Sequence, residues 1–281
     1  MFKVQGLKFK VQFFLFLSFF LLFTFSLSAQ PSSIVILHTN DTHSHLESYF
    51  DADIQEVVGG IVRRHAFIQE TRKEYPNTIV VDAGDFSQGT PYFNLFKGFP
   101  EIDLMNKMGY DVVALGNHEF DNGSKALAKR LKQADFKIVC ANYQFKNKQL
   151  AKLVKPYTII NTGDKKIGFF GLLCNMERVV MPNHYKETTF LDPVAIAQKM
   201  VDILQNKEHC DIIICLSHLG INTEIEREIT DRDIAEKIAG IDFIIGGHTH
   251  RLIEKPEIVN NTKILQAKNN GAYVGRLVIC E

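Results

Sequence analysis

Five short apolar runs recur along the chain, and each contains β-branched residues. They occupy residues 34–37, 78–81, 112–115, 212–215 and 243–245. Runs of four or so apolar residues, bounded by glycine or polar turn residues, are typical of buried strands. The pattern therefore predicts five strands whose side chains are covered on both faces.

Segments with helical periodicity separate most of these runs. They occupy residues 61–72, 101–108, 124–133, 193–205 and 234–239. Further strand-like stretches at 157–160, 167–172, 263–266 and 273–279 have no helix between neighbours, so we expect them to add antiparallel pairs to the sheet. The alternation indicates an α/β fold with a mixed sheet or two stacked sheets. No Pro/Gly/Ser-rich linker follows residue 31, so residues 30–281 are expected to form one domain.

A polar or glycine-containing cluster follows each of the five runs. The clusters are Asp41-Thr42-His43, Gly84-Asp85, Gly116-Asn117-His118-Glu119, Ser217-His218 and Gly246-Gly247-His248-Thr249-His250. In open α/β sheets, sites form at the edge where the carboxyl ends of the strands meet. We therefore expect the five clusters to converge at one common edge.

The side chains in these clusters are oxygen and imidazole donors, and no cysteine is among them. Such donors suit Zn, Mn, Fe or Mg rather than an ion that prefers thiolates. Asp41 and His43 alternate along an extended chain, so both could reach one ion, and His248 and His250 repeat that spacing. Asp85 carries two oxygens and could bridge two ions. Each cluster alone is a weak signal, but all five in order predict a two-metal phosphoesterase centre.

The N-terminus has the layout of a signal peptide. Three lysines precede an apolar stretch from Phe13 to Phe25, and small residues follow up to Ala29. We expect cleavage near Ala29 and export to the periplasm, cell surface or medium. The alternative is an uncleaved membrane anchor, because residues 11–27 approach the length that spans a bilayer.

Charge and cysteine content narrow the class of protein. Removing residues 1–29 takes away three of the 32 basic residues and none of the 32 acidic ones, which leaves a formal net charge of −3. This balance gives no reason to expect a nucleic-acid partner. The five cysteines form no CxxC pair and mostly lie in apolar context, so buried free thiols are favoured over a disulfide framework.

Two longer segments carry a specific resemblance. Residues 34–44, IVILHTNDTHS, and residues 110–121, YDVVALGNHEFD, resemble the signature segments of the 5′-nucleotidase family, which belongs to the calcineurin-like metallophosphoesterases. Residues 59–63 and 82–91 are also similar, and the resemblance runs from about residue 34 to residue 280. It implies a four-layer α/β-β/α sandwich that hydrolyses nucleotides or related small phosphate esters.

The resemblance also implies a role for each matching residue. One ion would be held by Asp41, His43 and His250, the other by Asn117, His218 and His248, with Asp85 bridging and His118 and Asp121 as the catalytic pair. A hydroxide between the two ions would attack phosphorus, and His118, kept cationic by Asp121, would stabilise the developing charge. Asp121 could also be a helix N-cap, and the two roles are compatible.

Several nearby polar residues receive weaker predictions. Glu119 is expected to have a supporting role, because adjacent residues point apart. Arg63, which follows a Gly-Gly turn, and Asn142, which ends another strand, are weak substrate-binding candidates. The remaining histidines are expected to be structural or solvated. They are His38, His45, His65, His184 and His209.

The chain departs from the family in one respect. Well-known members carry a second, C-terminal domain that binds the nucleobase, and no such region follows here. The favoured interpretation is an exported dinuclear 5′-nucleotidase-like phosphoesterase. A 2′,3′-cyclic-nucleotide phosphodiesterase is the nearest alternative, followed by a catalytic half that needs a separate substrate-binding partner protein. A non-enzymatic metal-binding protein is disfavoured because no ligand is missing.

Overall fold

A computed structural model describes residues 33–279, apart from residue 53 and residues 223–227. The predicted signal peptide and Cys280 lie outside the described residues. Residues 33–281 form one compact unit. Across the part of the chain that the structure describes, no helix is both long enough and apolar enough to cross a membrane.

Two six-stranded sheets form the centre of this unit. The first has the order β16-β1-β4-β5-β6-β8, and the second has the order β14-β15-β13-β12-β10-β9. The strands of the first sheet are β1 (Ile34–Thr39), β4 (Thr78–Asp82), β5 (Val112–Ala114), β6 (Lys137–Val139), β8 (Val154–Lys155) and β16 (Gly275–Ile279). Those of the second are β9 (Tyr157–Thr162), β10 (Lys165–Leu173), β12 (Ile212–His218), β13 (Phe243–Gly246), β14 (Glu257–Val259) and β15 (Thr262–Leu265).

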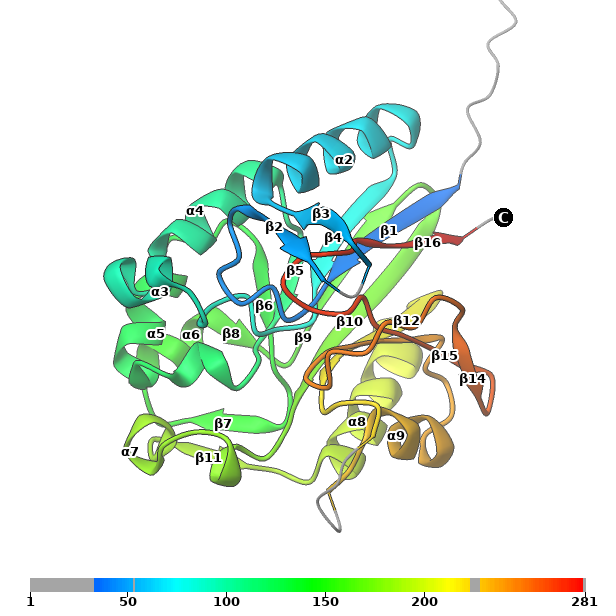
Figure 1. The fold of residues 1–281 in the computed structure, drawn as a ribbon. Helices are drawn as coiled ribbons and strands as arrows, with labels where there is room; N and C mark the ends of the chain where they lie inside the picture. Colours follow the sequence, from blue (N-terminus) through cyan, green and yellow to red (C-terminus); the bar gives the residue numbers. More distant parts are fainter. Residues whose placement is uncertain (1–32, 53, 223–227, 280–281) are drawn as a thin grey trace, which may run out of the picture. The chain divides into compact units, whose positions relative to one another are not determined.

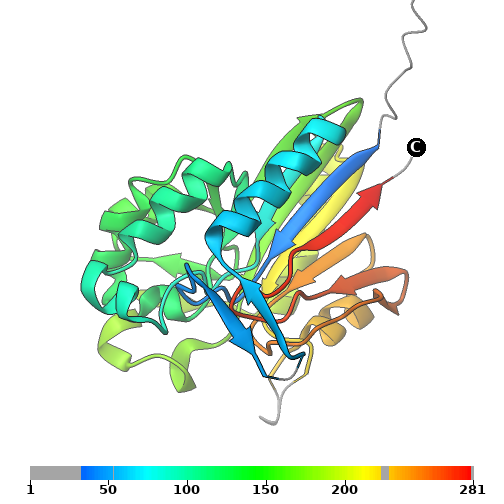
Figure 2. The same ribbon diagram turned by 45° about the horizontal axis from the view of Figure 1, so that its top comes forward.

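All five predicted strands exist, but they do not share one edge. β1, β4 and β5 run parallel in the first sheet, whereas β12 and β13 run parallel in the second. The expected single edge is therefore wrong: the polar clusters converge because two sheets end at the same place. The expected antiparallel pairs are present, with β16 beside β1 (Figure 2) and β9 beside β10.

Alternation along β1 shows how the layers are built. Ile34 and Ile36 belong to the core between the sheets, while Val35 and Leu37 belong to the core on the outer face. This two-residue period is what a strand buried on both faces requires. Between the sheets, β10 approaches β6 so closely that a Cβ on Gly171 would overlap the carbonyl group of Val139.

Helices cover both outer faces (Figure 1). The helices α2 (Ile61–Glu74), α4 (Phe99–Met108) and α5 (Gly123–Leu131) pack with the first sheet, and α8 (Pro193–Asp202) and α9 (Asp231–Lys237) pack with the second. These are the five helices that the periodicity predicts, with bounds shifted by a few residues. A π-helical turn, η3 (Ile203–Lys207), continues α8. The expected four-layer sandwich is confirmed.

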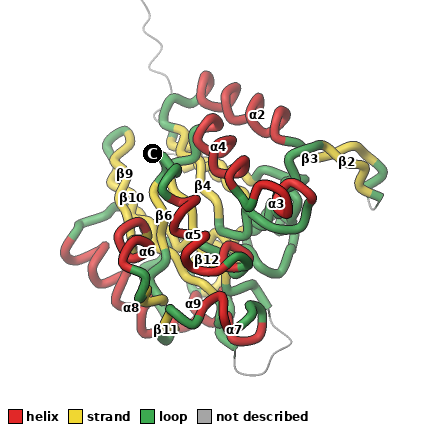
Figure 3. The backbone as a smooth tube through the Cα atoms, turned by 90° about the vertical axis from the view of Figure 1, so that its left-hand side faces the viewer, coloured by secondary structure: helices red, strands yellow, loops and turns green. Residues whose placement is uncertain are grey.

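The structure also contains short elements that the pattern did not predict. A hairpin of β2 (Ser48–Asp51) and β3 (Glu56–Gly59) projects from the body of the unit, as Figure 3 shows. The others are the strands β8 and β14, given above, and α3 (Pro91–Phe96), η1 (His118–Phe120), β7 (Tyr143–Phe145), α6 (Lys148–Leu153), η2 (Met176–Arg178), α7 (Pro182–Tyr185) and β11 (Thr188–Phe190). Each is too short to show a period in the sequence.

Candidate metal centre

The backbone bends sharply in three of the five polar clusters. Several candidate ligands adopt left-handed backbone angles, which non-glycine residues rarely do. Their φ values are 48° for Asp41, 45° for His43, 56° for Asp85, 70° for His248 and 54° for His250. The expected extended alternation of Asp41 and His43 is thus replaced by tight turns. Such a backbone costs on the order of 1–3 kcal/mol per residue and is common at functional sites.

Hydrogen bonds between neighbouring loops hold these turns in place. The Asp41 amide donates to the Gly84 carbonyl at 2.9 Å, and the His43 amide donates to the Asp85 carbonyl at 3.0 Å. The His248 amide donates to the Asp41 carboxylate at 2.9 Å. The loops after β1, β4 and β13 are therefore fastened to one another although they come from two sheets.

A first group of donor atoms comprises Asp41, His43 and His250. The Nε2 atoms of His43 and His250 lie 3.0 Å apart, and Asp41 Oδ1 lies 3.8 Å and 3.4 Å from them. Asp41 and His43 are buried, whereas the His250 side chain is 41% exposed. Three donors converging at the surface of the unit fit the coordination of a divalent cation.

A second group comprises Asp85, His218 and His248, and a third links Asp85 and His43 with His118. His218 Nε2 lies 2.9 Å from Asp85 Oδ2 and 3.8 Å from Asp41 Oδ1. Asp85 therefore stands between the two histidine clusters, as a bridging carboxylate would.

His218 is oriented as a ligand. Its Nδ1 lies 2.8 Å from the Ala83 carbonyl, which can only accept, so Nδ1 carries a proton and Nε2 faces the carboxylates. Burial lowers the pKa of His218, but the negative charge of Asp85 and Asp41 outweighs burial and raises the pKa to about 10. The same negative charge favours a divalent cation at Nε2.

Two other members of the predicted set, His248 and Asn117, are also in states compatible with metal binding. Burial, followed by the charge of His218, lowers the pKa of His248 to about 4, so its imidazole is neutral and can donate a lone pair. Asn117 is buried shortly after the β5 strand, and its Oδ1 accepts a weak hydrogen bond from the Cys174 thiol at 3.8 Å. The donor set as a whole fits divalent cations of the Zn, Mn, Fe or Mg type.

His118 and Asp121 form a pair beside these groups. His118 Nδ1 lies 2.8 Å from Asp121 Oδ2, so the ring's other nitrogen is left for a substrate. Burial lowers the pKa of His118, but the hydrogen bond to Asp121 and the charge of Asp85 outweigh it and raise the pKa to about 9. The alternative role of Asp121 as an N-cap is not observed, because the N-cap of α5 is Asn122.

Two buried carboxylates behind the site were not predicted. Asp82 accepts hydrogen bonds from the Gly84 amide and from Thr39 Oγ1, and burial raises its pKa to about 7. Asp231, on α9, accepts from Ser217, the residue before His218. In the sequence Asp82 is marked by its place at the end of a strand and by the family-like segment 82–91 that it begins, whereas Asp231 is marked only as a helix start.

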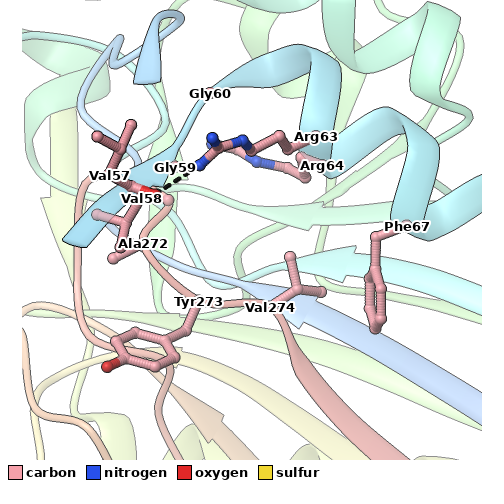
Figure 4. A pocket seen from close by; sticks show the side chains of 11 residues that line it. Val57, Val58, Gly59, Gly60, Arg63, Arg64, Phe67, Ala272, Tyr273 and Val274 are labelled. Carbon is pink, nitrogen blue, oxygen red and sulfur yellow. Dashed lines mark hydrogen bonds between the residues drawn. The ribbon is translucent and has the colours of Figure 1, made fainter. Parts of the chain in front are cut away.

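The weak substrate-binding candidates occupy different surroundings. Arg63 is exposed on α2, and its Nη1 donates to the Val57 carbonyl of the hairpin at 2.5 Å (Figure 4). Asn142 is fully buried, and its amide both donates to and accepts from the backbone of Leu173, at 2.7 Å and 2.9 Å. The Asn142 amide is thus occupied in joining the segment after β6 to β10.

The cysteines and remaining histidines behave largely as expected. Cys140, Cys174 and Cys215 are buried free thiols, and Cys210 is a half-buried one. Among the described residues, the donor groups include none of the five histidines set aside above.

Comparison with known proteins identifies the family. Residues 34–252 match the model of the calcineurin-like phosphoesterases. The chain is 34% identical over 279 residues to the trifunctional nucleotide phosphoesterase protein YfkN of Bacillus subtilis, covering 87% of this chain and 18% of that protein. It is 35% identical over 273 residues to human 5′-nucleotidase, covering 88% of this chain and 46% of that protein.

Solved structures give the same result. The 5′-nucleotidase precursor of Thermus thermophilus superposes with a TM-score of 0.78 at 34% identity, over 88% of this chain and 51% of that chain. The structure of YfkN from Bacillus subtilis superposes with a TM-score of 0.69 at 28% identity, over 88% of this chain and 84% of that chain.

The chain thus spans less than half the length of the curated relatives named here. The fold, the family match and the similarity to 5′-nucleotidases all agree with the resemblance seen in residues 34–44 and 110–121. The chain belongs to the calcineurin-like phosphoesterases.

Proposed function

We propose that this chain is a metal-dependent hydrolase of phosphate esters that acts on nucleotides with two divalent cations bound. The observation that carries the proposal is the sharing of donors: Asp85 belongs both to the group with His218 and His248 and to the group with His43 and His118. A shared carboxylate between two histidine clusters is the arrangement that a pair of cations requires.

The donor sets assign residues to each cation. Asp41, His43 and His250 would hold one, Asn117, His218 and His248 would hold the other, and Asp85 would contact both. The two cations would neutralise the phosphoryl group and acidify the attacking water. Their identity among Zn, Mn, Fe and Mg is part of the experiment below.

The chain's own residues would then orient and protonate the substrate. His118 is cationic at neutral pH and lies within 4.8 Å of donor atoms of His43 and Asp85, so its free ring nitrogen can donate to a phosphoryl oxygen or to the leaving group. Asp121 fixes the orientation of the ring and favours its charged form. Ordinary general-acid assistance of this kind is worth about 10²–10⁴-fold in rate.

A metal-supplemented substrate screen tests the proposal. Purified protein would be assayed with Mn or Zn against nucleoside monophosphates, cyclic nucleotides and nucleotide sugars. Asp85→Asn is expected to lower metal content and activity together, and His118→Asn to lower activity with metal content retained. His184→Asn, which alters a histidine outside the donor groups, is the matched control. Unchanged rate and metal content in Asp85→Asn would contradict the bridging assignment.

The same screen separates the alternatives. Preference for 2′,3′-cyclic nucleotides would identify a phosphodiesterase, whereas activity that appears only with a co-purifying protein would identify a catalytic half. We also propose export, supported by the lysine-apolar-small pattern of residues 1–29 and by relatives that include a snake venom 5′-nucleotidase. Fractionation of cells, with N-terminal sequencing of the recovered protein, would show whether residues 1–29 are removed.

A further inference from the structure

A cavity of about 480 Å³ opens next to the candidate metal centre. Two segments form its walls: residues 44–49, which follow β1 and include the first two residues of β2, and residues 90–96, which include α3. The side chains that face it are mostly aromatic or aliphatic. Those used below are His45, Glu47, Tyr49, Tyr92, Leu95 and Phe96. We refer to it as the aromatic cavity.

The aromatic cavity lies directly beside the candidate metal centre. Ser44, which lines it, directly follows the candidate ligand His43. The Gln88 amide and Thr90 Oγ1 donate to Ser44 at 3.0 Å and 3.1 Å, so the two walls are joined at this residue. A Cβ on Gly89 would lie 3.4 Å from His43 Cβ, which places the second wall beside the same histidine.

Ring geometry on the first wall suits a flat ligand. The rings of His45 and Tyr49 lie 5.3 Å apart at 57° to each other. Tyr49 is tied through a hydrogen bond to Asn270, whose amide donates to the Asp41 carbonyl at 2.7 Å, so this wall is anchored to the metal centre. Aromatic walls of this kind bind planar rings by stacking and by edge-to-face contact.

Charge in the aromatic cavity decides which part of a substrate fits. Among the described residues that line it, none is a lysine or an arginine, and Glu47 places a carboxylate there, with Tyr92 donating to Glu47 at 2.8 Å. A phosphate would be repelled by Glu47, while the metal centre beside it attracts one. A neutral ring with hydrogen-bond donors would be favoured, because Glu47 Oε2 can accept from it.

The mouth is apolar and open to solvent. Leu95 is 72% exposed and Phe96 is 52% exposed. Covering a ring system would remove the apolar surface of these side chains from water, which is favourable. A volume of a few hundred Å³, lined by apolar groups and a few polar ones, is typical of small-molecule sites.

We infer that the aromatic cavity binds the neutral, flat organic group of the phosphate ester, a nucleobase or similar ring, while its phosphate lies at the metal centre. This inference rests on the proposed function. The aromatic cavity would then be a ring-binding subsite, which the sequence alone did not suggest.

The test compares two esters of the same phosphate group. Full-length protein with Mn would hydrolyse adenosine 5′-monophosphate, which carries a ring, and ribose 5-phosphate, which does not. Wild type is expected to show a kcat/KM at least about tenfold higher for the first. Tyr92→Ala, and separately Leu95→Asp at an exposed position, are expected to reduce this ratio about fivefold. Phe67→Ala, in a separate cavity (Figure 4), is the matched control and should keep the ratio.

A binding measurement separates this inference from the proposed function. Saturation-transfer NMR with adenosine, in EDTA, needs no phosphate and no metal. A ring-proton signal in wild type that is weakened in Tyr92→Ala supports the aromatic cavity even if no ester is hydrolysed, in which case only the proposed function fails. Hydrolysis of both esters at equal kcat/KM, with no adenosine signal, overturns the inference and leaves the proposed function intact.

Discussion

The Glu119 carboxylate holds the backbone of Asp85. Glu119 Oε2 accepts from the Asp85 amide at 2.9 Å and from the Gly116 amide at 2.7 Å, and Oε1 accepts from the amide and hydroxyl of Ser87. Arg130, also fully buried, donates to the Glu119 carbonyl. One carboxylate therefore fixes the loop after β4 to the loop after β5, and the supporting role expected for Glu119 has a geometric basis.

Glu119→Gln should weaken metal binding without removing any candidate ligand. The amide nitrogen of glutamine would face backbone N–H groups that need acceptors, so the two loops would separate. We expect metal affinity to fall by about 10–100-fold, as for other groups that orient ligands. Metal titration followed by elemental analysis measures this. Glu101→Gln is the control, since Glu101 is buried near Arg130; equal metal affinity in both variants would exclude the role.

Asp121→Asn should shift the pH profile. With its pKa at about 9, His118 is cationic below that pH, so activity that needs the cation should stay level near neutrality and fall as pH rises through the pKa. Bound cations lower the pKa of His118 in wild type and in Asp121→Asn alike. The quantity to compare is therefore the difference in pKa between the two proteins. Loss of the Asp121 charge should move the alkaline fall to lower pH by roughly one unit. Profiles of kcat/KM check this, with Asp103→Asn, in an exposed pair with Lys107, as control. Superimposable profiles would show that Asp121 does not act through His118.

Gly116→Ala should disturb Asp85 sterically. A Cβ on Gly116 would overlap Asp85 Oδ1. The backbone of Gly116 is not left-handed, so alanine would cause no backbone strain there, and the expected effect is the steric overlap with Asp85. We expect activity to fall by about 10²-fold, because misplacement by an ångström is costly in a catalytic site. Gly168→Ala, whose Cβ would meet the flexible Leu204 side chain at 2.8 Å, controls for general destabilisation. Steady-state kinetics and metal content are the measurements, and full activity in Gly116→Ala would show that the Asp85 position is not critical.

Asp231→Asn should remove a pH dependence of stability. Burial raises the pKa of Asp231 to about 7 from 3.8, so its ionised form is disfavoured in the folded chain. The free energy of unfolding should therefore decline as pH rises from about 4 to about 7, by at most about 1.4 kcal/mol per pH unit. Asparagine has no proton to lose, so the stability of the variant relative to wild type should rise over this window. Urea unfolding in EDTA measures the difference, with Asp164→Asn, an exposed carboxylate, as control. A constant difference from about pH 4 to about pH 8 would mean that Asp231 does not titrate there.

The apolar pattern predicts the long elements well, because their periods extend over enough residues to be read. The runs that become β1 and β12, and the periodic segment that becomes α2, appear in the structure within a few residues of their expected bounds. The hairpin of β2 and β3, and α3, escape prediction because their residues are largely exposed and their spans are four to six residues. The aromatic cavity also escapes prediction, since β2 and α3 form part of its walls.

The sequence by itself indicated an α/β fold, the family resemblance and the candidate donor side chains. Burial patterns and residue types are local properties, so Asp41, Asp85 and His218 could be named from their positions after apolar runs. Only the tertiary structure decided how they meet. The donors come from two sheets and reach one another through left-handed turns at Asp41, Asp85 and His248. Such turns are unfavourable in isolation, and they persist because hydrogen bonds from loops distant in the sequence hold them.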